Sequence, residues 1–338
     1  MGIRIISGGL LTTVQDRGRH GYMRFGMTPA GAMDERSYMI ANLLVGNEGG
    51  EAALEATVIP PQLEFTSSAV FAVTGGDFRP LLNGREIPMY SACRAQAGDR
   101  LTFGGRRTGC RVYIAFQGGL DVPEVMGSRS TDLKAGIGGL QGRRLNAGDE
   151  LEFLPAESAG DGTAALPEDF SGGETFLRVI PGPQDDRFTR EGMETFLTTA
   201  YTVTEKSDRM GCRLEGRAIE TACGSDIITD GICMGAVQVP ADGRPIIMMA
   251  DRQPTGGYVK IANIISVDLP RVAQLMPGDA VQFRRVGVEE AQQLLLEQAE
   301  DMKRIRRRAA ETTEHRYRVT VNGTAYEVTV EKADEKGE

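Results

Sequence analysis

Short runs of alternating apolar and polar residues, separated by turn residues, make up most of the chain. Three of these runs begin alike, with a Gly-Asp pair followed by apolar residues at every second position and ending in Phe. Such alternation predicts strands with one buried face. The three segments are residues 97–103, 147–153 and 277–283. Two interpretations stay open: related β units, or a Gly-Asp turn of the kind that many β proteins use.

Further strands are predicted where short apolar runs lie between turn residues. Residues 79–87 carry Asn83-Gly84 at their centre, which is the signature of a tight β-hairpin. The first residues of the chain are also typical of a strand. The other predicted strands are 53–58, 62–65, 69–74, 110–116, 175–180, 236–239, 245–249 and 259–267. So many short strands predict closed or sandwiched sheets.

Helical periodicity is confined to a few segments. Residues 33–45 place apolar side chains at helical spacing and end at Gly46, a residue typical of helix C-caps. The longest predicted helix has an acidic beginning and a basic end, which suits the helix dipole better than a nucleic-acid patch. The further predicted helices are 185–197, 270–275 and 288–310.

The segment from residue 156 to residue 173 has almost no large apolar residues and predicts a domain boundary. We therefore expect an N-terminal domain over 1–156 and a second domain over 174–286, followed by a helix over 287–311. A hairpin fragment is predicted over 315–332, where the sequence alternates around Asn322-Gly323. An isolated hairpin is marginally stable, so we expect it to dock on another surface.

The charge balance excludes some functions. Subtracting 47 acidic from 38 basic residues gives a net charge of -9, and the basic run over 303–308 lies at the end of a predicted helix, which argues against a nucleic-acid groove. No apolar run approaches the roughly 20 residues that span a bilayer. The N-terminus lacks the long apolar region of a secretory signal. We expect a cytoplasmic protein that binds neither membranes nor nucleic acid.

Composition also limits the catalytic chemistry. With only His20 and His315 in the chain, histidine catalysis is disfavoured. The five cysteines are odd in number and widely spaced, which predicts reduced core thiols and no metal site. The sequence contains no P-loop. Its one loose dinucleotide motif, Gly160 to Ala165, lies in the polar linker without a preceding strand, and we discount it.

Polar residues gather in four loops that set a carboxylate beside an arginine. Each loop bears glycine, which lets the backbone come close to a ligand. One interpretation is an Asp-capped turn with an Arg partner. The other is an anion-binding cleft, which four such loops favour because Arg binds carboxylate or phosphate in bidentate fashion. The loops are residues 15–21, 207–211, 239–245 and 250–260.

Long strings in and around these loops resemble a known family. They are Gly9–Arg19, Ala41–Asn47, Ser207–Gly211 and Asp251–Tyr258. The strings are similar to those of the KipA family, also called allophanate hydrolase subunit 2 or the biotin-dependent carboxyltransferase family, from about residue 3 to residue 286. The resemblance implies a mainly β protein with two cyclophilin-like β-barrel domains, followed by the long helix and the C-terminal hairpin.

The resemblance implies the C subunit of a multi-subunit, ATP-dependent 5-oxoprolinase, which opens 5-oxoproline to glutamate. Its partners would be a KipI-like B subunit and a LamB/YcsF-like A subunit. The alternatives are half of a biotin-dependent carboxyltransferase of the urea or amide carboxylase type and a non-catalytic antagonist that binds KipI. ATP would be used by the complex, at a site not located in this chain.

Only the carboxyltransferase alternative implies biotin as a cofactor. Residues 316–331 resemble the opening strands of a biotinyl carrier domain, but no Met-Lys-Met biotin site follows them. Biotin would therefore be borne by a separate carrier protein. The hairpin is equally compatible with a plain stabilising tail.

The amide chemistry that the family implies needs an activated nitrogen and a stabilised oxyanion, which arginine, backbone N–H groups and a nearby carboxylate can supply. We expect the two barrels to direct these groups into a single pocket that a second protein completes. The candidate catalytic residues are Asp16, Arg17, Asp208, Arg209, Asp251 and Arg252. The candidate substrate-binding residues are Gln15, Ser207, Gln238, Gln253, Thr255, Gly256, Gly257, Tyr258 and Lys260.

Overall fold

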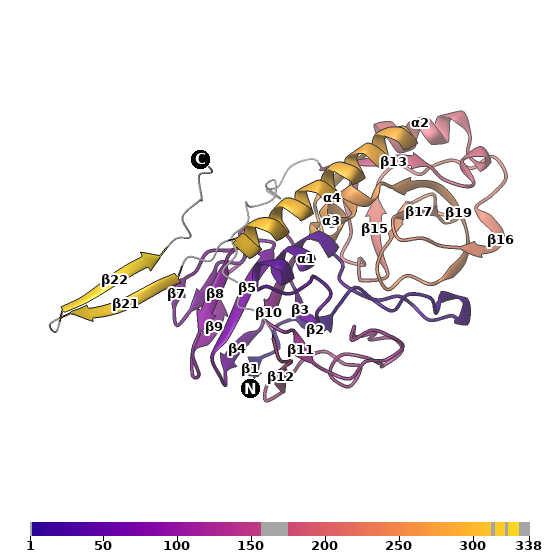
Figure 1. The fold of residues 1–338 in the computed structure, drawn as a ribbon. Helices are drawn as coiled ribbons and strands as arrows, with labels where there is room; N and C mark the ends of the chain where they lie inside the picture. The colour runs from indigo at the N-terminus through magenta and orange to yellow at the C-terminus, as the bar shows by residue number, and fades with distance from the viewer. Residues whose placement is uncertain (1, 157–174, 312–314, 322–323, 331–338) are drawn as a thin grey trace, which may run out of the picture.

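Strands dominate the architecture, which a computed structural model describes for residues 2–156, 175–311, 315–321 and 324–330. Figure 1 shows two β-rich domains with one long helix running across both. The helices are α1 (Glu35–Leu44), α2 (Arg190–Thr198), α3 (Leu269–Gln274) and α4 (Val288–Glu311). Short 3-10 helices are formed by Met23–Phe25, Asp185–Arg187 and Ser266–Asp268. Within the described ranges, no helix is long and apolar enough to cross a membrane.

The first domain consists of two antiparallel sheets. One has the strand order β11-β12-β1-β4-β9-β6-β7 and the other has the order β2-β3-β10-β5-β8. All six residues of β10 are buried, because its inner face packs on the core between the sheets and its outer face is covered by α1. The strands are β1 (Gly2–Ser7), β2 (Leu11–Gln15), β3 (Ala53–Thr57), β4 (Gln62–Phe65), β5 (Ala69–Gly75), β6 (Pro80–Leu82), β7 (Arg85–Glu86), β8 (Ala92–Ala95), β9 (Arg100–Phe103), β10 (Arg111–Phe116), β11 (Leu120–Asp121) and β12 (Glu150–Phe153).

The second domain is a closed barrel of seven strands in the order β13-β20-β14-β15-β18-β17-β19, and pairing of β13 with β19 closes it. An eighth strand, β16, pairs with β19 outside the closed ring. Alternation decides which side chains face inward: Val237 and Val239 enter the core, while Gln238 points outward. The strands are β13 (Thr175–Pro181), β14 (Tyr201–Val203), β15 (Gly211–Glu215), β16 (Asp226–Gly231), β17 (Ala236–Val239), β18 (Ile246–Met248), β19 (Thr255–Ile264) and β20 (Ala280–Arg285).

Helices α1 and α4 lie where the two domains meet. Asp34 caps α1 by accepting a hydrogen bond from the backbone N–H of Ser37, which satisfies a donor at the start of the helix. The long helix α4 lies across α1 and across the 3-10 helix that precedes α3 (Figure 1). Its Met302 and Ile305 pack against the cluster formed by α1 and β10. The helix therefore bridges the two domains.

The three Gly-Asp segments form one repeated turn. In each, the glycine has a φ between 90° and 96°, in the left-handed region that glycine tolerates best. The following carboxylate accepts a hydrogen bond of 2.7 Å from the backbone N–H three residues earlier. The carboxylates belong to Asp99, Asp149 and Asp279, and the strands that follow are β9, β12 and β20. The predicted strands and their common turn are confirmed.

The mainly β fold, the long helix and the terminal hairpin are confirmed. The hairpin strands are β21 (His315–Val321) and β22 (Thr324–Val330), while their Asn322-Gly323 turn lies outside the described residues. In Figure 1 this hairpin projects away from the first domain instead of packing on the barrel. The discounted dinucleotide motif and all of the predicted domain boundary except residue 156 fall in residues 157–174, also outside the described part.

Two predicted elements differ from the structure. The helix expected over 185–197 is broken, because Phe188 is extended and Thr189 caps a new helix at the backbone N–H of Gly192. The strand expected over 259–267 is β19, which begins earlier, at Thr255, and ends at Ile264 where the chain enters a 3-10 turn.

The cysteine prediction is correct for oxidation state and partly wrong for burial. All five thiols are free, and Cys110 and Cys212 are buried. Cys223 and Cys233, however, are exposed. The prediction of burial failed for these two residues because the spacing of cysteines carries no information about burial. Among the residues with described side chains, no group of three or more His, Cys, Asp or Glu could hold a metal ion.

Candidate active site

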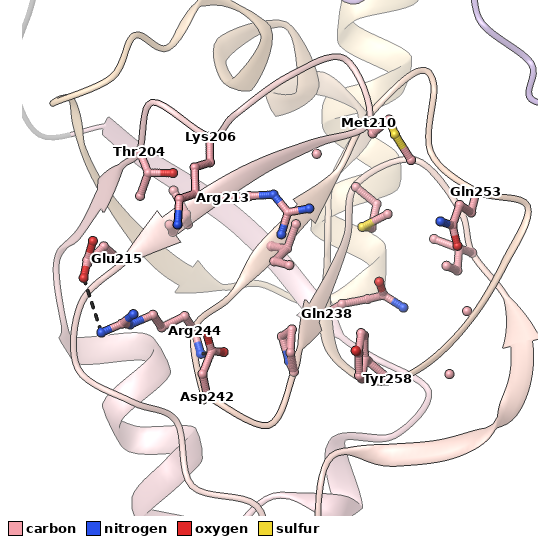
Figure 2. Close-up of a pocket in the computed structure, with 18 residues that line it drawn as sticks. Thr204, Lys206, Met210, Arg213, Glu215, Gln238, Asp242, Arg244, Gln253 and Tyr258 are labelled. Carbon is pink, nitrogen blue, oxygen red and sulfur yellow. Dashed lines mark hydrogen bonds and ion pairs between the residues drawn. The ribbon is translucent and has the colours of Figure 1, made fainter. Parts of the chain in front are cut away.

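The best-formed candidate site is a pocket of about 500 Å³ on the outer face of the second barrel, here called the barrel pocket. Strands β15, β17 and β18, the beginning of β19 and the adjoining turns surround it. Figure 2 shows its side chains in two groups, a mainly charged group around Lys206 and Arg244 and a neutral group around Gln238, Gln253 and Tyr258. The pocket is therefore polar at both ends but charged at only one.

Gln238 dominates the neutral end. Its side chain is 5% exposed, and its Nε2 atom has no hydrogen-bond partner among the described residues. A buried, unpaired amide donor costs roughly 1–3 kcal/mol, which a ligand acceptor would recover once the side chain turns Nε2 toward the pocket. Gly256 makes this arrangement possible, because a Cβ atom there would lie 2.9 Å from Nε2 and 2.6 Å from Cδ1 of Ile232. Any larger residue would displace the amide or Ile232.

The charged end is formed by the cations of Lys206, Arg213 and Arg244 and by the carboxylates of Glu215 and Asp242. Arg244 is in an ion pair with Glu215, with 3.3 Å between Nη2 and Oε1. The Arg213 guanidinium lies between the charged and neutral groups in Figure 2. The Thr204 hydroxyl is a second buried polar atom of the pocket without a partner among the described residues. This end is suited to a carboxylate or another anion.

Arg209 and Asp251 lie together, but in a buried cluster instead of a pocket. The Nε atom of Arg209 is 2.8 Å from Oδ2 of Asp251, and its Nη1 forms an ion pair with Glu55 of the first domain. Its Nη2 also donates to the carbonyl of Gly31, at 2.6 Å. Burial lowers the pKa of Arg209, but the charges of Asp251 and Glu55 more than offset this, so the net shift is upward. The guanidinium is a fixed cation that joins the two domains.

The candidates from the first loop lie in the first domain, away from the barrel pocket. Asp16 is buried and accepts hydrogen bonds from the Gly18 backbone N–H, at 2.7 Å, and from the Ser128 hydroxyl, at 2.6 Å. Arg17 is exposed and donates from Nε to the carbonyl of Gly49. Gln15 is buried and donates to the carbonyl of Thr131. These contacts stabilise a loop of the first domain.

The remaining candidates separate into three groups. Gln238, Gln253, Gly256, Gly257 and Tyr258 line the barrel pocket, and their role as substrate contacts stays a prediction. Ser207 and Asp208 form a turn beside it, with Asp208 accepting from the Met210 and Gly211 backbone N–H groups. Arg252 and Lys260 line a second cavity, and Thr255 lines neither.

The expectation of a single shared pocket is therefore wrong. Arg17, Arg209 and Arg252 lie in an exposed loop, in a buried cluster and in a separate cavity. In the turns at Asp16, Asp208 and Asp242, the interpretation as a capped turn holds, because each carboxylate accepts a nearby backbone N–H. The catalytic roles of the six candidates stay predictions.

Of the three cations that line the barrel pocket, Arg244 belongs to one of the four predicted loops, whereas Lys206 and Arg213 were not predicted. Arg213 lies between Cys212 and Leu214, which are both buried, so alternation along β15 predicts that its side chain faces outward. Nothing local shows which outward residues meet across β15, β17 and β18. Lys206 and Arg244 lie in turns, and only the closed barrel brings them to Arg213.

Comparison with known proteins identifies the family. The family described as carboxyltransferase domain, subdomain A and B, matches residues 25–285. The chain belongs to this carboxyltransferase family. Its barrel pocket and its second cavity lie almost entirely inside the matched range, whereas Gln15, Asp16 and Arg17 precede it.

Individual members of the carboxyltransferase family are similar over most of the chain. The C subunit of the 5-oxoprolinase of Escherichia coli is 39% identical over 289 residues, which are 86% of this chain and 93% of that protein. The urea amidolyase of Saccharomyces cerevisiae is 33% identical over 313 residues, but the match spans 17% of its length. The crystal structure of the K. lactis urea amidolyase superposes with a TM-score of 0.86 at 34% identity, covering 90% of this chain and 20% of that one.

Proposed function

We propose that this chain is the C subunit of an ATP-dependent 5-oxoprolinase, acting with a KipI-like B subunit and a LamB/YcsF-like A subunit. The observation that carries the proposal is the match to the C subunit of the Escherichia coli 5-oxoprolinase, which spans 93% of that protein. The urea amidolyases, by contrast, are several times longer than the segment they share with this chain.

The barrel pocket supports the proposal by its shape and charge. The substrate 5-oxoproline has a lactam at one end and a carboxylate at the other. A primary amide such as that of Gln238 can donate to a lactam C=O and accept from a lactam N–H. The carboxylate would then lie toward Arg213 and Lys206, which line the charged end.

Each end of the pocket then has a distinct task. Gln238 fixes the lactam and polarises its carbonyl through Nε2, the atom that lacks a partner in the described residues. Arg213 holds the carboxylate and so orients the ring. A docked partner protein would exclude water from the open side, which strengthens these polar contacts. ATP, which would activate the lactam oxygen, we assign to the complex, because the sequence has no P-loop.

The test is reconstitution with the A and B subunits, followed by measurement of glutamate release from 5-oxoproline and ATP. Gln238→Leu removes the unpaired donor and should lower kcat/KM by about 10- to 100-fold. Arg213→Gln should mainly raise KM. The control is Arg100→Gln, which removes an exposed cation paired with Glu64 in the first domain and should leave turnover unchanged. Full activity of Gln238→Leu would remove the barrel pocket from the mechanism.

The structural similarity to the K. lactis urea amidolyase favours one second candidate, a biotin-dependent carboxyltransferase half. Biotin would be borne by a separate carrier protein, and avidin would then block turnover. We expect glutamate release by the reconstituted complex to be insensitive to avidin. Avidin-sensitive transfer of a carboxyl group to urea, without glutamate release, would favour the second candidate.

A further inference from the structure

A second cavity, of about 670 Å³, lies between the barrel and the 3-10 helix Met23–Phe25 of the first domain. Ile232 borders both this cavity and the barrel pocket, so the two are neighbours. Its backbone N–H donates to the carbonyl of Pro254, at 3.0 Å, which ties the dividing wall together. Much of the lining is apolar, and the polar exceptions include Arg252, Lys260, Cys233 and Asn263.

Arg252 is the unusual feature of this cavity. It is 7% exposed, and no carboxylate of the described residues lies within ion-pair distance of it. Its Nε donates to the carbonyl of Ile232, at 3.1 Å, and its Nη1 to that of Met249, at 3.2 Å. These bonds occupy two of the five N–H donors of a guanidinium. The neighbouring Asp251 is held by Arg209 instead.

Lys260 adds a second cation on the same wall. Its side chain is 3% exposed, and its Nζ is 2.8 Å from Oδ2 of Asp230, a carboxylate that is itself 53% exposed. Two cations and one acid leave a net charge of +1 beside the cavity. A buried cation without an opposite charge is costly, and a bound anion removes that cost.

We propose that the second cavity is an oxyanion-binding site that receives the phosphate or carboxylate group of a small ligand. The guanidinium of Arg252 binds the anion through its remaining donors, and Lys260 adds charge from the side. The prolines at positions 181, 183 and 254, with Met23, contact the apolar part of the ligand. The site is separate from the barrel pocket, so it does not depend on which amide the complex hydrolyses.

The isolated full-length chain, titrated with inorganic phosphate and separately with acetate, tests this proposal without any turnover assay. Glycine amide resonances in NMR spectra report the location, because Gly182 and Gly231 line the second cavity while Gly211 and Gly257 line the barrel pocket. We expect saturable shifts at Gly182 and Gly231. Saturation by phosphate indicates a phosphate group in the ligand, and saturation by acetate alone indicates a carboxylate. Shifts confined to Gly211 and Gly257, or no saturation with either anion, would overturn the proposal.

Three variants sharpen the test. Arg252→Gln should weaken anion binding about 10-fold or more. Because removal of a buried side chain can unfold a protein, a second pair leaves Arg252 in place: Cys233→Asp puts a carboxylate into the cavity and should abolish binding, whereas Cys233→Ser should preserve it. Cys233 is exposed, so both substitutions are compatible with folding. Undiminished binding in Cys233→Asp and Arg252→Gln would place the anion elsewhere.

Discussion

Replacement of Arg209 by Met is the sharpest test of how the two domains are held together. The side chains of Arg209 and Glu55 are 6% and 1% exposed, and that of Asp251 is 10% exposed. Met reaches only as far as the Nε position of Arg and carries no charge, so Arg209→Met leaves Asp251 without its cation and Glu55 with only Arg111, 3.9 Å away. Breaking a buried ion pair on one side costs about 3–5 kcal/mol. For a chain of 338 residues, we expect the melting temperature to fall by about 4–7 °C.

The pH dependence separates this mechanism from simple loss of packing. Burial raises the pKa of a carboxyl group, as it does for Asp251 in the intact protein even against the opposing effect of Arg209. Without the cation, the folded variant would bind more protons than its unfolded chain. Its stability relative to the parent should therefore recover as the pH falls from about 8 to about 5.

Urea unfolding followed by circular dichroism, at several pH values, measures both effects. The control is Arg4→Met, which removes an exposed ion pair with Glu150 and should lower the free energy of unfolding by less than about 1 kcal/mol. The role of this buried cluster in stabilising the protein would be refuted if the free energy of unfolding of Arg209→Met lay within about 1 kcal/mol of that of the parent at neutral pH. A loss of stability that does not depend on pH would refute it as well.

Three further predictions concern packing and thiol reactivity. Gln274→Leu should destabilise the protein by about 2–4 kcal/mol in urea unfolding, because Gln274 accepts from two backbone N–H groups of the first domain; a loss under about 1 kcal/mol would contradict this. Phe196→Ala should lower the free energy of unfolding by about 3–5 kcal/mol, because the buried ring of Phe196 stacks on Phe283 with 4.3 Å between centroids. A smaller loss would mean that neighbouring side chains move to fill the cavity. Iodoacetamide at neutral pH should label Cys233 and spare Cys212, since burial raises the pKa of Cys212 to about 12, and equal labelling in peptide mass spectra would be inconsistent with the buried site.

Much of the fold is predictable because its signals are local. Helix α1 has its cap and its apolar face within a dozen residues, and the Gly-Asp strands carry their own turns. Strand β16 was missed because its residues are mostly exposed and it is held by β19 outside the ring. Closure of the barrel by β13 and β19 joins strands about 80 residues apart, and no local pattern encodes such a pairing.

The candidate site also has one part that local sequence signals predict and another that depends on contacts between distant residues. The neutral end of the barrel pocket includes Gln253 and Tyr258, which belong to a continuous string that the sequence analysis singled out. The inference of one pocket failed because Arg209 pairs with Glu55, 154 residues away, and is thereby removed from the surface. Charge and loop composition alone do not distinguish a cation that binds a ligand from one that joins two domains.

The repeated Gly-Asp turn has a consequence for how the chain folds. Its carboxylate bond spans three residues, so it can form in microseconds, before distant strands meet. Most pairings in both domains join residues far apart in the chain, and such topologies fold slowly. Three self-contained turns fix where β9, β12 and β20 begin, and so shorten the search for register during that slow phase.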